Sequence, residues 1–272
     1  MGERIMPTII VFTDLDGTLL DPKTYSFDDA RPALELIRQR NIPLIICSSK
    51  TRAEIEVYRS RLANGHPFVS ENGGGAFIPE KYFPFAVDGE TQAGYRQIRF
   101  GSPYQELRDA LTGLRERLST KVRGFGDMST KEIAALSGLP EAEAALAKMR
   151  DFDEPFIFEE ADADVDAFLW AIEARGYHWT RGRFYHIIGE NDKGKAATFL
   201  KSMYEKQYGP ILSIALGDNL NDLPLLRVVD NPVLVRGADE SYEASVSLPN
   251  LIKADGIGPQ GWNRAIMRLL AE

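Results

Sequence analysis

The chain has 272 residues, of which 44% are hydrophobic and 26% are charged, a composition that excludes a disordered chain and suits one large or two smaller globular domains. It has 32 Lys and Arg residues against 40 Asp and Glu residues, which gives a net charge of −8. No dense basic run is present, and this excludes nucleic acid as the main partner.

Short apolar runs, several of them β-branched, predict strands that are buried on both faces. They are Ile9–Thr13, Pro43–Ser48, Phe68–Ser70 and, much later, Ile211–Leu216. The first run is too short for a membrane span or a signal-peptide core. Cys47, the single cysteine, cannot form an internal disulfide, and we expect it to be a small core residue. We therefore expect a cytoplasmic protein that has no membrane partner.

Helical patterns separate these runs in the first part of the chain. Pro32 is tolerated only in the first turn of a helix, so the first helix is expected to begin near Asp28 or Asp29. A second helix is expected over about residues 51–63, where Ile55 and Tyr58 recur at helical spacing. Buried strands that alternate with helices predict a β-α-β-α-β unit with a parallel sheet.

The middle of the chain differs in character, because helices follow one another there. The segment "SPYQELRDALTGLRERL" predicts a helix with a capping box of Ser102 and Gln105 and with Pro103 at the first helical position. Further helices are expected at "STKEIAALSG" and "LPEAEAALAKMRDF". A strand "PFIFE", a helix "DVDAFLWAIEARG" and an aromatic strand "GRFYHIIG" come next.

These patterns predict the fold class and the domain organisation. We expect an α/β fold in which residues 1–84 and 188–272 form a Rossmann-like core with a parallel sheet. Residues 85–187 are expected to form an inserted α+β module.

Acidic and hydroxyl side chains follow the predicted strands. Asp14 and Asp16 come after the first strand, Ser48 ends the second, and "GDNLND", which begins with Asp218, comes after the last. Ligands of an open parallel sheet bind outside these carboxyl ends, which can meet at one rim. Three carboxylates with hydroxyls and amides, and without a His or Cys set, favour Mg²⁺ over zinc. A structural calcium site is the alternative, although its ligands usually lie close together in one loop.

Four motifs resemble, in order and spacing, those of the haloacid-dehalogenase-like phosphatases. They are "DLDGTLLD", "SSK", "DKGKA" and "GDNLND", and they cover both flanks of the chain. The resemblance implies that Asp14 is a nucleophile that forms an aspartyl-phosphate. It also implies that Asp16 is the general acid and base.

The same resemblance implies the remaining members of the site. Mg²⁺ would bind the Asp14 side chain, the Asp16 backbone carbonyl and Asp218, with Asn219 and Asp222 as support. Ser48 matches the hydroxyl that binds the transferred phosphoryl group. Lys193 matches the lysine that balances charge between the nucleophile and the phosphoryl oxygens. The same segment also offers Lys195, and for either residue an ordinary surface lysine at a helix start is an equally good explanation.

The inserted module lies between the second and third motifs, as in the large α/β caps of the sugar-phosphatase branch. Within that branch, "CSSKTRAEIE", "SENGGGAFIP", "FDEPF", "RGRFYHIIGENDKGKA" and "GPQGWN" look most like mannosyl-3-phosphoglycerate phosphatases. The resemblance implies a small phosphorylated sugar-glycerate substrate. Another sugar phosphatase, for glucosyl-3-phosphoglycerate or sucrose phosphate, a phosphomutase and a non-catalytic binding protein stay open.

Candidate substrate-binding residues lie beside the second motif. "ENGGG" offers Asn72 for polar contacts and Gly73 and Gly74 for close backbone approach, although a plain turn explains the glycines about as well. Lys50 lies just beyond Ser48, where it either faces the site or begins a solvated helix.

The inserted module offers further candidates in a predicted hairpin. Arg181 and Arg183 flank Gly182, and two neighbouring positive charges would suit a carboxylate or a phosphate. An exposed turn is the alternative. His186 lies in an alternating aromatic strand, where a core histidine is more common than a ligand.

Overall fold

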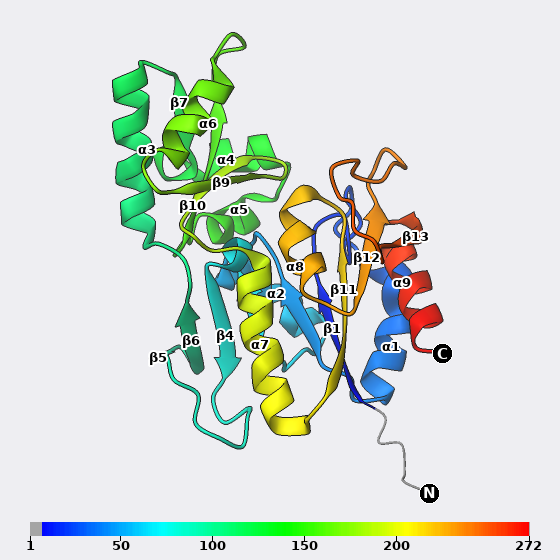
Figure 1. The fold of residues 1–272 in the computed structure, drawn as a ribbon. Helices are drawn as coiled ribbons and strands as arrows, with labels where there is room; N and C mark the ends of the chain where they lie inside the picture. Colours follow the sequence, from blue (N-terminus) through cyan, green and yellow to red (C-terminus); the bar gives the residue numbers. More distant parts are fainter. Residues whose placement is uncertain (1–6, 272) are drawn as a thin grey trace, which may run out of the picture.

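The computed structural model describes residues 7–271, which form two separate β-sheets with helices packed on them (Figure 1). One sheet has nine strands and the other has four. The first six residues of the expected core segment 1–84 and the last residue of segment 188–272 lie outside the described residues.

Six neighbouring strands of the larger sheet are parallel. In spatial order they are β13 (Ile252–Ile257), β12 (Asn231–Arg236), β11 (Ile211–Gly217), β1 (Thr8–Thr13), β2 (Leu44–Cys47) and β3 (Phe68–Ser70). The chain runs outward from β1 on one side and from β11 on the other, so the strand order reverses between these two. An open α/β sheet binds its ligand at such a reversal. The four buried strands predicted from the sequence are confirmed.

Helices cover both faces of this sheet because its strands are buried on both sides. One face carries α1 (Arg31–Gln39), α2 (Arg52–Arg61) and α9 (Gly258–Leu269), and the other carries α7 (Lys193–Tyr208) and α8 (Leu223–Arg227). Successive residues of β1 supply the two cores, since Val11 packs in the first and Phe12 in the second. Cys47 is buried in the second core, as expected.

The first two helices begin close to where the sequence predicted. A 3₁₀ turn (Asp28–Ala30) precedes α1, so Pro32 stands in the first α-helical turn. Helix α2 begins after Thr51, which forms a reciprocal capping box with Glu54. Among residues 7–271, no helix is long and apolar enough to cross a membrane.

Antiparallel strands extend the larger sheet beyond β3. They are β4 (Gly75–Pro79), β6 (Tyr95–Arg99) and β5 (Glu90–Gln92). Residues 90–99 therefore lie in the larger sheet, although we expected the inserted module to begin at residue 85. No buried apolar run marked them, because β5 is exposed and β6 is only partly buried. We propose that the inserted module begins near Gly101.

The smaller sheet is antiparallel. Its strands, in spatial order, are β7 (Val122–Gly124), β8 (Asp153–Phe158), β10 (Tyr185–Ile188) and β9 (His178–Arg181). Helices α3 (Tyr104–Leu118) and α6 (Val165–Glu173) share one core with it, while α4 (Thr130–Ser137) and α5 (Glu141–Ala147) enclose a second, smaller one. The predicted hairpin at Gly182 is confirmed, since it joins β9 to β10. The sequence did not predict β7 or β9.

The start of α3 differs from the prediction. Pro103 has extended backbone (ψ 141°) and is the N-cap residue rather than the first helical one, so Ser102 lies too early to cap the helix. The amide of Tyr104 donates instead to the carbonyl of Asp151 (2.8 Å), and the Gln105 side chain donates along the helix to Asp109. A distant backbone carbonyl thus replaces the predicted capping box.

The chain passes between the two sheets at Gly101 and Gly189. A Cβ atom at Gly189 would lie 2.6 Å from the nitrogen of Ser102. A Cβ atom at Gly101 would lie 2.9 Å from the Cβ of Phe152. The outgoing and returning segments therefore lie against each other, and there is no room for a side chain at either glycine.

Candidate active site

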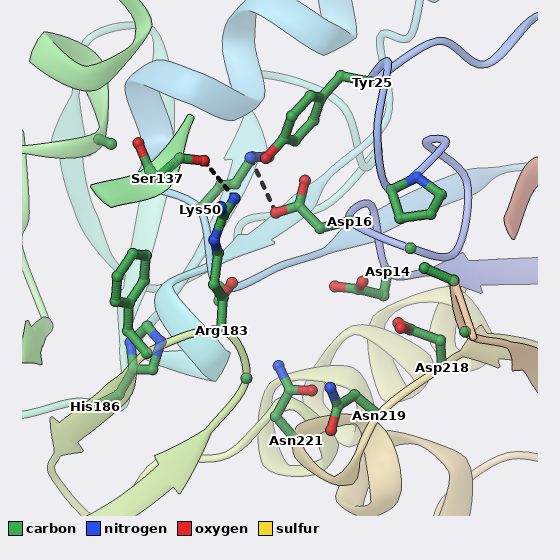
Figure 2. A pocket seen from close by; sticks show the side chains of 18 of the residues that line it. Asp14, Asp16, Tyr25, Lys50, Ser137, Arg183, His186, Asp218, Asn219 and Asn221 are labelled. Atoms are coloured by element: carbon green, nitrogen blue, oxygen red, sulfur yellow. Dashed lines mark hydrogen bonds and ion pairs between the residues drawn. The ribbon is translucent and has the colours of Figure 1, made fainter. Parts of the chain in front are cut away.

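Asp14 and Asp218 stand where the strand order reverses. Asp14 follows β1, and its amide donates to the carbonyl of Leu216 in β11 (3.0 Å), so the pairing of the two strands continues up to the first carboxylate. Carboxylate oxygens of Asp14, Asp218 and Asp222 lie within 4.8 Å of one another. Figure 2 shows Asp14 and Asp218 side by side at one end of a pocket. Carboxylates some two hundred residues apart in the sequence are thus brought together.

Lys193 lies behind these carboxylates. It is fully buried, and its Nζ lies 2.7 Å from Oδ1 of Asp14 and 2.6 Å from Oδ1 of Asp222. It is the first residue of α7, whose start is fixed by Asp192 through a hydrogen bond from the amide of Lys195 (2.8 Å). The Lys195 side chain is exposed and donates to a backbone carbonyl instead. Of the two lysines that the sequence left open, Lys193 is the one that contacts Asp14.

Asp222 and Thr18 hold the loop that follows β11. Oδ2 of Asp222 accepts from the amides of Asp218 (3.0 Å) and Asn219 (3.2 Å), while its Oδ1 accepts from Lys193. Because both oxygens are engaged, Asp222 suits a supporting position. The Thr18 hydroxyl donates to Oδ1 of Asp218 (2.9 Å). Sequence reasoning missed Thr18, and its place in the first motif was the available signal.

The clustered carboxylates shift one another's protonation. Burial, reinforced by Asp222 and Asp16 and opposed by Lys193, raises the pKa of Asp14 to about 7. Burial, together with Asp222 and Asp14, raises the pKa of Asp218 well above its usual value. A bound cation would relieve this repulsion. The donors described here are all oxygen atoms, with no His or Cys among them, so these residues fit Mg²⁺.

The Asp16 side chain lies apart from this cluster and pairs with Lys50. Nζ of Lys50 lies 2.9 Å from Oδ2 of Asp16 (Figure 2). It lies 3.6 Å from Oε1 of Glu54. Burial alone would lower the pKa of Lys50, but these two carboxylates outweigh it and raise that pKa. Lys50 is buried just before the capping residue Thr51, so it faces the site and does not begin a solvated helix.

The acidic groups line one end of a cavity of about 460 Å³ between the two sheets. The predicted site residues among its lining are Asp14, Asp16, Lys50, Asp218, Asn219, Arg183 and His186. Ser48 is fully buried at the end of β2, is absent from the described lining, and accepts a hydrogen bond from the Lys50 amide (3.2 Å). Sequence reasoning missed Arg150, which also lines the cavity.

His186 is held by a chain of hydrogen bonds that reaches the loop after β11. Its Nδ1 lies 2.7 Å from Oδ1 of Asp153, and Oδ2 of Asp153 accepts from Asn72 (2.8 Å). Oδ1 of Asn72 in turn accepts from Asn221 (3.2 Å). Burial would raise the pKa of Asp153, but His186, Arg150 and Asn72 together lower it. The Asp153 carboxylate therefore fixes the ring and leaves Nε2 for the cavity.

Four predicted substrate-binding residues lie outside the described lining of this cavity, namely Asn72, Gly73, Gly74 and Arg181. Gly73 has a φ of +90°, and a Cβ atom there would lie 2.1 Å from the carbonyl oxygen of Asp192. A Cβ atom at Gly74 would lie 2.3 Å from the Cβ of Phe152. Both glycines thus serve close backbone packing. Arg181 is exposed, and its guanidinium lies over the ring of Tyr185 (4.9 Å).

The sequence is similar to known hydrolases along most of its length. The haloacid dehalogenase-like hydrolase family matches residues 11–84. The chain is 46% identical over 265 residues, 97% of each protein, to a glucosyl-3-phosphoglycerate/mannosyl-3-phosphoglycerate phosphatase of Methanococcoides burtonii. It is 37% identical to a mannosyl-3-phosphoglycerate phosphatase of Pyrococcus horikoshii, over 88% of this chain and 95% of that one.

The fold is similar to that of solved structures. A phosphatase of the haloalkanoate (HAD) superfamily from Bacteroides thetaiotaomicron superposes with a TM-score of 0.64, covering 100% of this chain and 97% of that one. The sequence identity to it is 16%, so this similarity shows the fold alone.

Proposed function

Because the chain belongs to the haloacid dehalogenase-like hydrolases, we propose that it is a Mg²⁺-dependent phosphatase that hydrolyses a glycosyl-3-phosphoglycerate. The observation that carries the chemistry is the meeting of Asp14 with Lys193 and Asp218 at the strand-order reversal. The substrate class rests on the names of the two relatives. We propose mannosyl-3-phosphoglycerate as a substrate and the glucosyl compound as a second one, since one relative is named for both.

Asp14 is the nucleophile in this proposal. Its carboxylate attacks phosphorus, the bond between phosphorus and the oxygen on C3 of the glycerate breaks, and an aspartyl-phosphate forms. Water then attacks phosphorus, the bond to Asp14 breaks, and phosphate leaves. Lys193 neutralises one oxygen of Asp14, and the other remains for the substrate. Mg²⁺ held by Asp14 and Asp218 would supply the positive charge that lets a carboxylate approach a phosphate dianion.

Asp16 is the general acid and base. Its side chain is 40% exposed, lines the cavity and lies outside the acidic cluster, so it can reach a leaving group. It protonates the departing alkoxide and later takes a proton from the attacking water. Lys50, 2.9 Å away, positions it.

Phosphate release from a panel of esters tests this function. We expect the unmodified chain to hydrolyse mannosyl- and glucosyl-3-phosphoglycerate with a kcat/KM well above that for hexose phosphates. Asp14→Asn, which is nearly isosteric, should abolish release while the protein stays folded. Near-normal release by Asp14→Asn would contradict the nucleophile assignment. Isomerised sugar phosphate without free phosphate would indicate a mutase, and no turnover of any ester would indicate a binding protein.

A further inference from the structure

Apart from Lys50, which pairs with Asp16 and Glu54, the charged side chains that line the cavity are segregated by sign. The acidic ones come from the larger sheet and its loops, and they are Asp14, Asp16, Glu54, Asp218, Asp239 and Glu243. The opposite wall is built from the smaller sheet and its helices. Over residues 7–271, that wall contributes Arg150, Arg183 and His186 to the lining and no acidic side chain. The cavity therefore has an acidic end and a cationic end.

The cations at the two ends differ in their partners. Lys50 pairs with Asp16 and Glu54. Arg150 donates from Nε to the carbonyl of Ala147 (2.8 Å) and from Nη1 to that of Ser49 (2.8 Å). Arg183 donates from Nη1 to the carbonyl of Ser137. No carboxylate in the described part of the chain lies within 4.0 Å of either guanidinium.

Both guanidinium groups are thus held in place by backbone carbonyls, with no carboxylate of residues 7–271 in direct contact. A guanidinium group has five N–H donors in a planar arrangement. Arg150 uses two of its donors in hydrogen bonds to backbone carbonyls, and Arg183 uses one. The remaining donors are available to an anion, while the charge of Arg150 also acts on the nearby carboxylates of Asp153 and Glu71. The planar fork matches a carboxylate better than an ammonium group does.

We propose that Arg150 and Arg183 bind the carboxylate of the glycerate part of the substrate. This inference rests on the proposed function, which brings one anionic group besides the phosphate. The phosphoryl group must reach Asp14 at the acidic end, so the second anion falls to the cationic wall. Arg150 was not a candidate from the sequence, because an arginine close to a helix C-terminus needs no ligand to explain it.

Arg150 also has a structural role that a test must separate from binding. Its hydrogen bond to Ser49 joins the inserted module to the larger sheet, next to a bond from the Thr51 hydroxyl to the carbonyl of Leu146 (2.9 Å). If Arg150 served only to join the module to the sheet, its substitution would affect the hydrolysis of every ester. A residue that binds the carboxylate affects substrates that carry one.

The first experiment compares two esters in three variants. The ratio of kcat/KM for mannosyl-3-phosphoglycerate to that for p-nitrophenyl phosphate should fall about 10- to 100-fold in Arg150→Met and in Arg183→Met, the effect of losing a charge-assisted hydrogen bond. Arg181→Met is the matched control, because Arg181 belongs to the same hairpin but lies over Tyr185 outside the cavity lining. The ratio should stay within about twofold there, as for an ordinary surface substitution.

A second experiment measures recognition without turnover of the natural substrate. Mannosylglycerate and mannosylglycerol differ by a carboxylate against a hydroxymethyl group, and both are used as inhibitors of p-nitrophenyl phosphate hydrolysis. Mannosylglycerate should inhibit the unmodified protein more strongly, and Arg150→Met should remove that advantage. If Arg150→Met does not fold, both experiments are done with Arg183→Met, because Arg183 is exposed and its substitution is better tolerated.

Three outcomes overturn the inference. An equal fall on both esters in Arg150→Met and Arg183→Met assigns these residues to structure. Equal inhibition by the two mannosyl compounds in the unmodified protein removes carboxylate recognition. Faster turnover of a sugar bisphosphate than of mannosyl-3-phosphoglycerate assigns the cationic wall to a second phosphate. The proposed function has its own contradicting result, which is hydrolysis of p-nitrophenyl phosphate without hydrolysis of the glycosyl phosphoglycerates. In that case the inhibition experiment still tests the two arginines.

Discussion

The ammonium group of Lys193 lies 2.7 Å from the carboxylate of Asp14, and neither the lysine nor its second partner Asp222 has exposed surface. Removing one partner of a buried ion pair leaves an uncompensated charge and costs about 3–5 kcal/mol. We expect Lys193→Met to lose about that much free energy of unfolding, measured in urea, and to release no measurable phosphate. Lys195→Met, two residues along the same helix and exposed, should retain both properties. Turnover within tenfold of normal in Lys193→Met would remove this lysine from the mechanism.

Metal removal is the second prediction. Asp14 and Asp218, supported by Asp222, should hold a divalent cation, so exhaustive chelation should stop phosphate release and Mg²⁺ should restore it. Because a ligand that binds only the folded protein stabilises it, Mg²⁺ should also raise the Tm of the unmodified chain. Asp218→Asn should lose that rise. Full activity after chelation, checked by metal analysis, would contradict the site.

The pairing of Lys50 with Asp16 predicts a dependence on the leaving group. An alkoxide needs protonation as it departs, whereas p-nitrophenolate does not, and general acid catalysis contributes about 10²–10⁴-fold. Lys50→Met should therefore slow glycerol phosphate hydrolysis at least about tenfold more than p-nitrophenyl phosphate hydrolysis. Arg52→Met, which breaks an ion pair with Glu56 outside the described cavity lining, is the control. A uniform loss on both esters would show that Lys50 does not act through Asp16.

Glu71 predicts how stability changes with pH. It is fully buried and accepts from the amides of Asp151 (3.1 Å) and Phe152 (2.8 Å). Burial, opposed by Arg150 and by these amides and reinforced by Asp153, raises the pKa of Glu71 from its ordinary 4.5 to about 8. The folded state therefore binds this proton more tightly than the unfolded state does. Its contribution to stability is complete below about pH 4.5 and is lost as the pH rises through about 8.

Urea unfolding at pH 5, 6, 7 and 8 measures this loss. Between these values the free energy of unfolding should carry a negative slope of up to about 1.4 kcal/mol per pH unit from Glu71. Glu71→Gln, which retains an acceptor oxygen for the amides, should reduce the slope by that amount. The same slope in both proteins would mean that Glu71 is ionised throughout this range.

The catalytic end of the cavity could be predicted because each of its parts leaves a local pattern. Buried strands read as apolar runs, and Asp14 and Asp218 come directly after two of them. The rule that ligands bind at the carboxyl ends of parallel strands then brings the two carboxylates together. Choosing Lys193 over Lys195 required the structure, because either lysine satisfies the pattern at a helix start.

The cationic end could not be predicted in the same way. Arg150 reaches the cavity because the end of α5 packs against the loop after β2, and no local pattern specifies contact between segments 100 residues apart. Strands β5 and β6 lack a buried apolar run, so the sequence did not predict that residues 90–99 belong to the larger sheet. The capping box expected at Ser102 was wrong for a related reason, since the carbonyl that takes its place belongs to Asp151.

Because the chain segments at Gly101 and Gly189 lie against each other, the segment between them, which carries the cationic wall of the cavity, could be replaced as a unit. Residues 102–188 begin and end at neighbouring points, so removing them would leave two ends that a short linker can rejoin at little entropic cost. A foreign module with similarly close ends could be grafted at the same two joints. Asp14, Lys193 and Asp218 all lie outside the exchanged segment. New leaving-group preferences could therefore be acquired by recombination at two positions, with the phosphoryl-transfer machinery inherited unchanged.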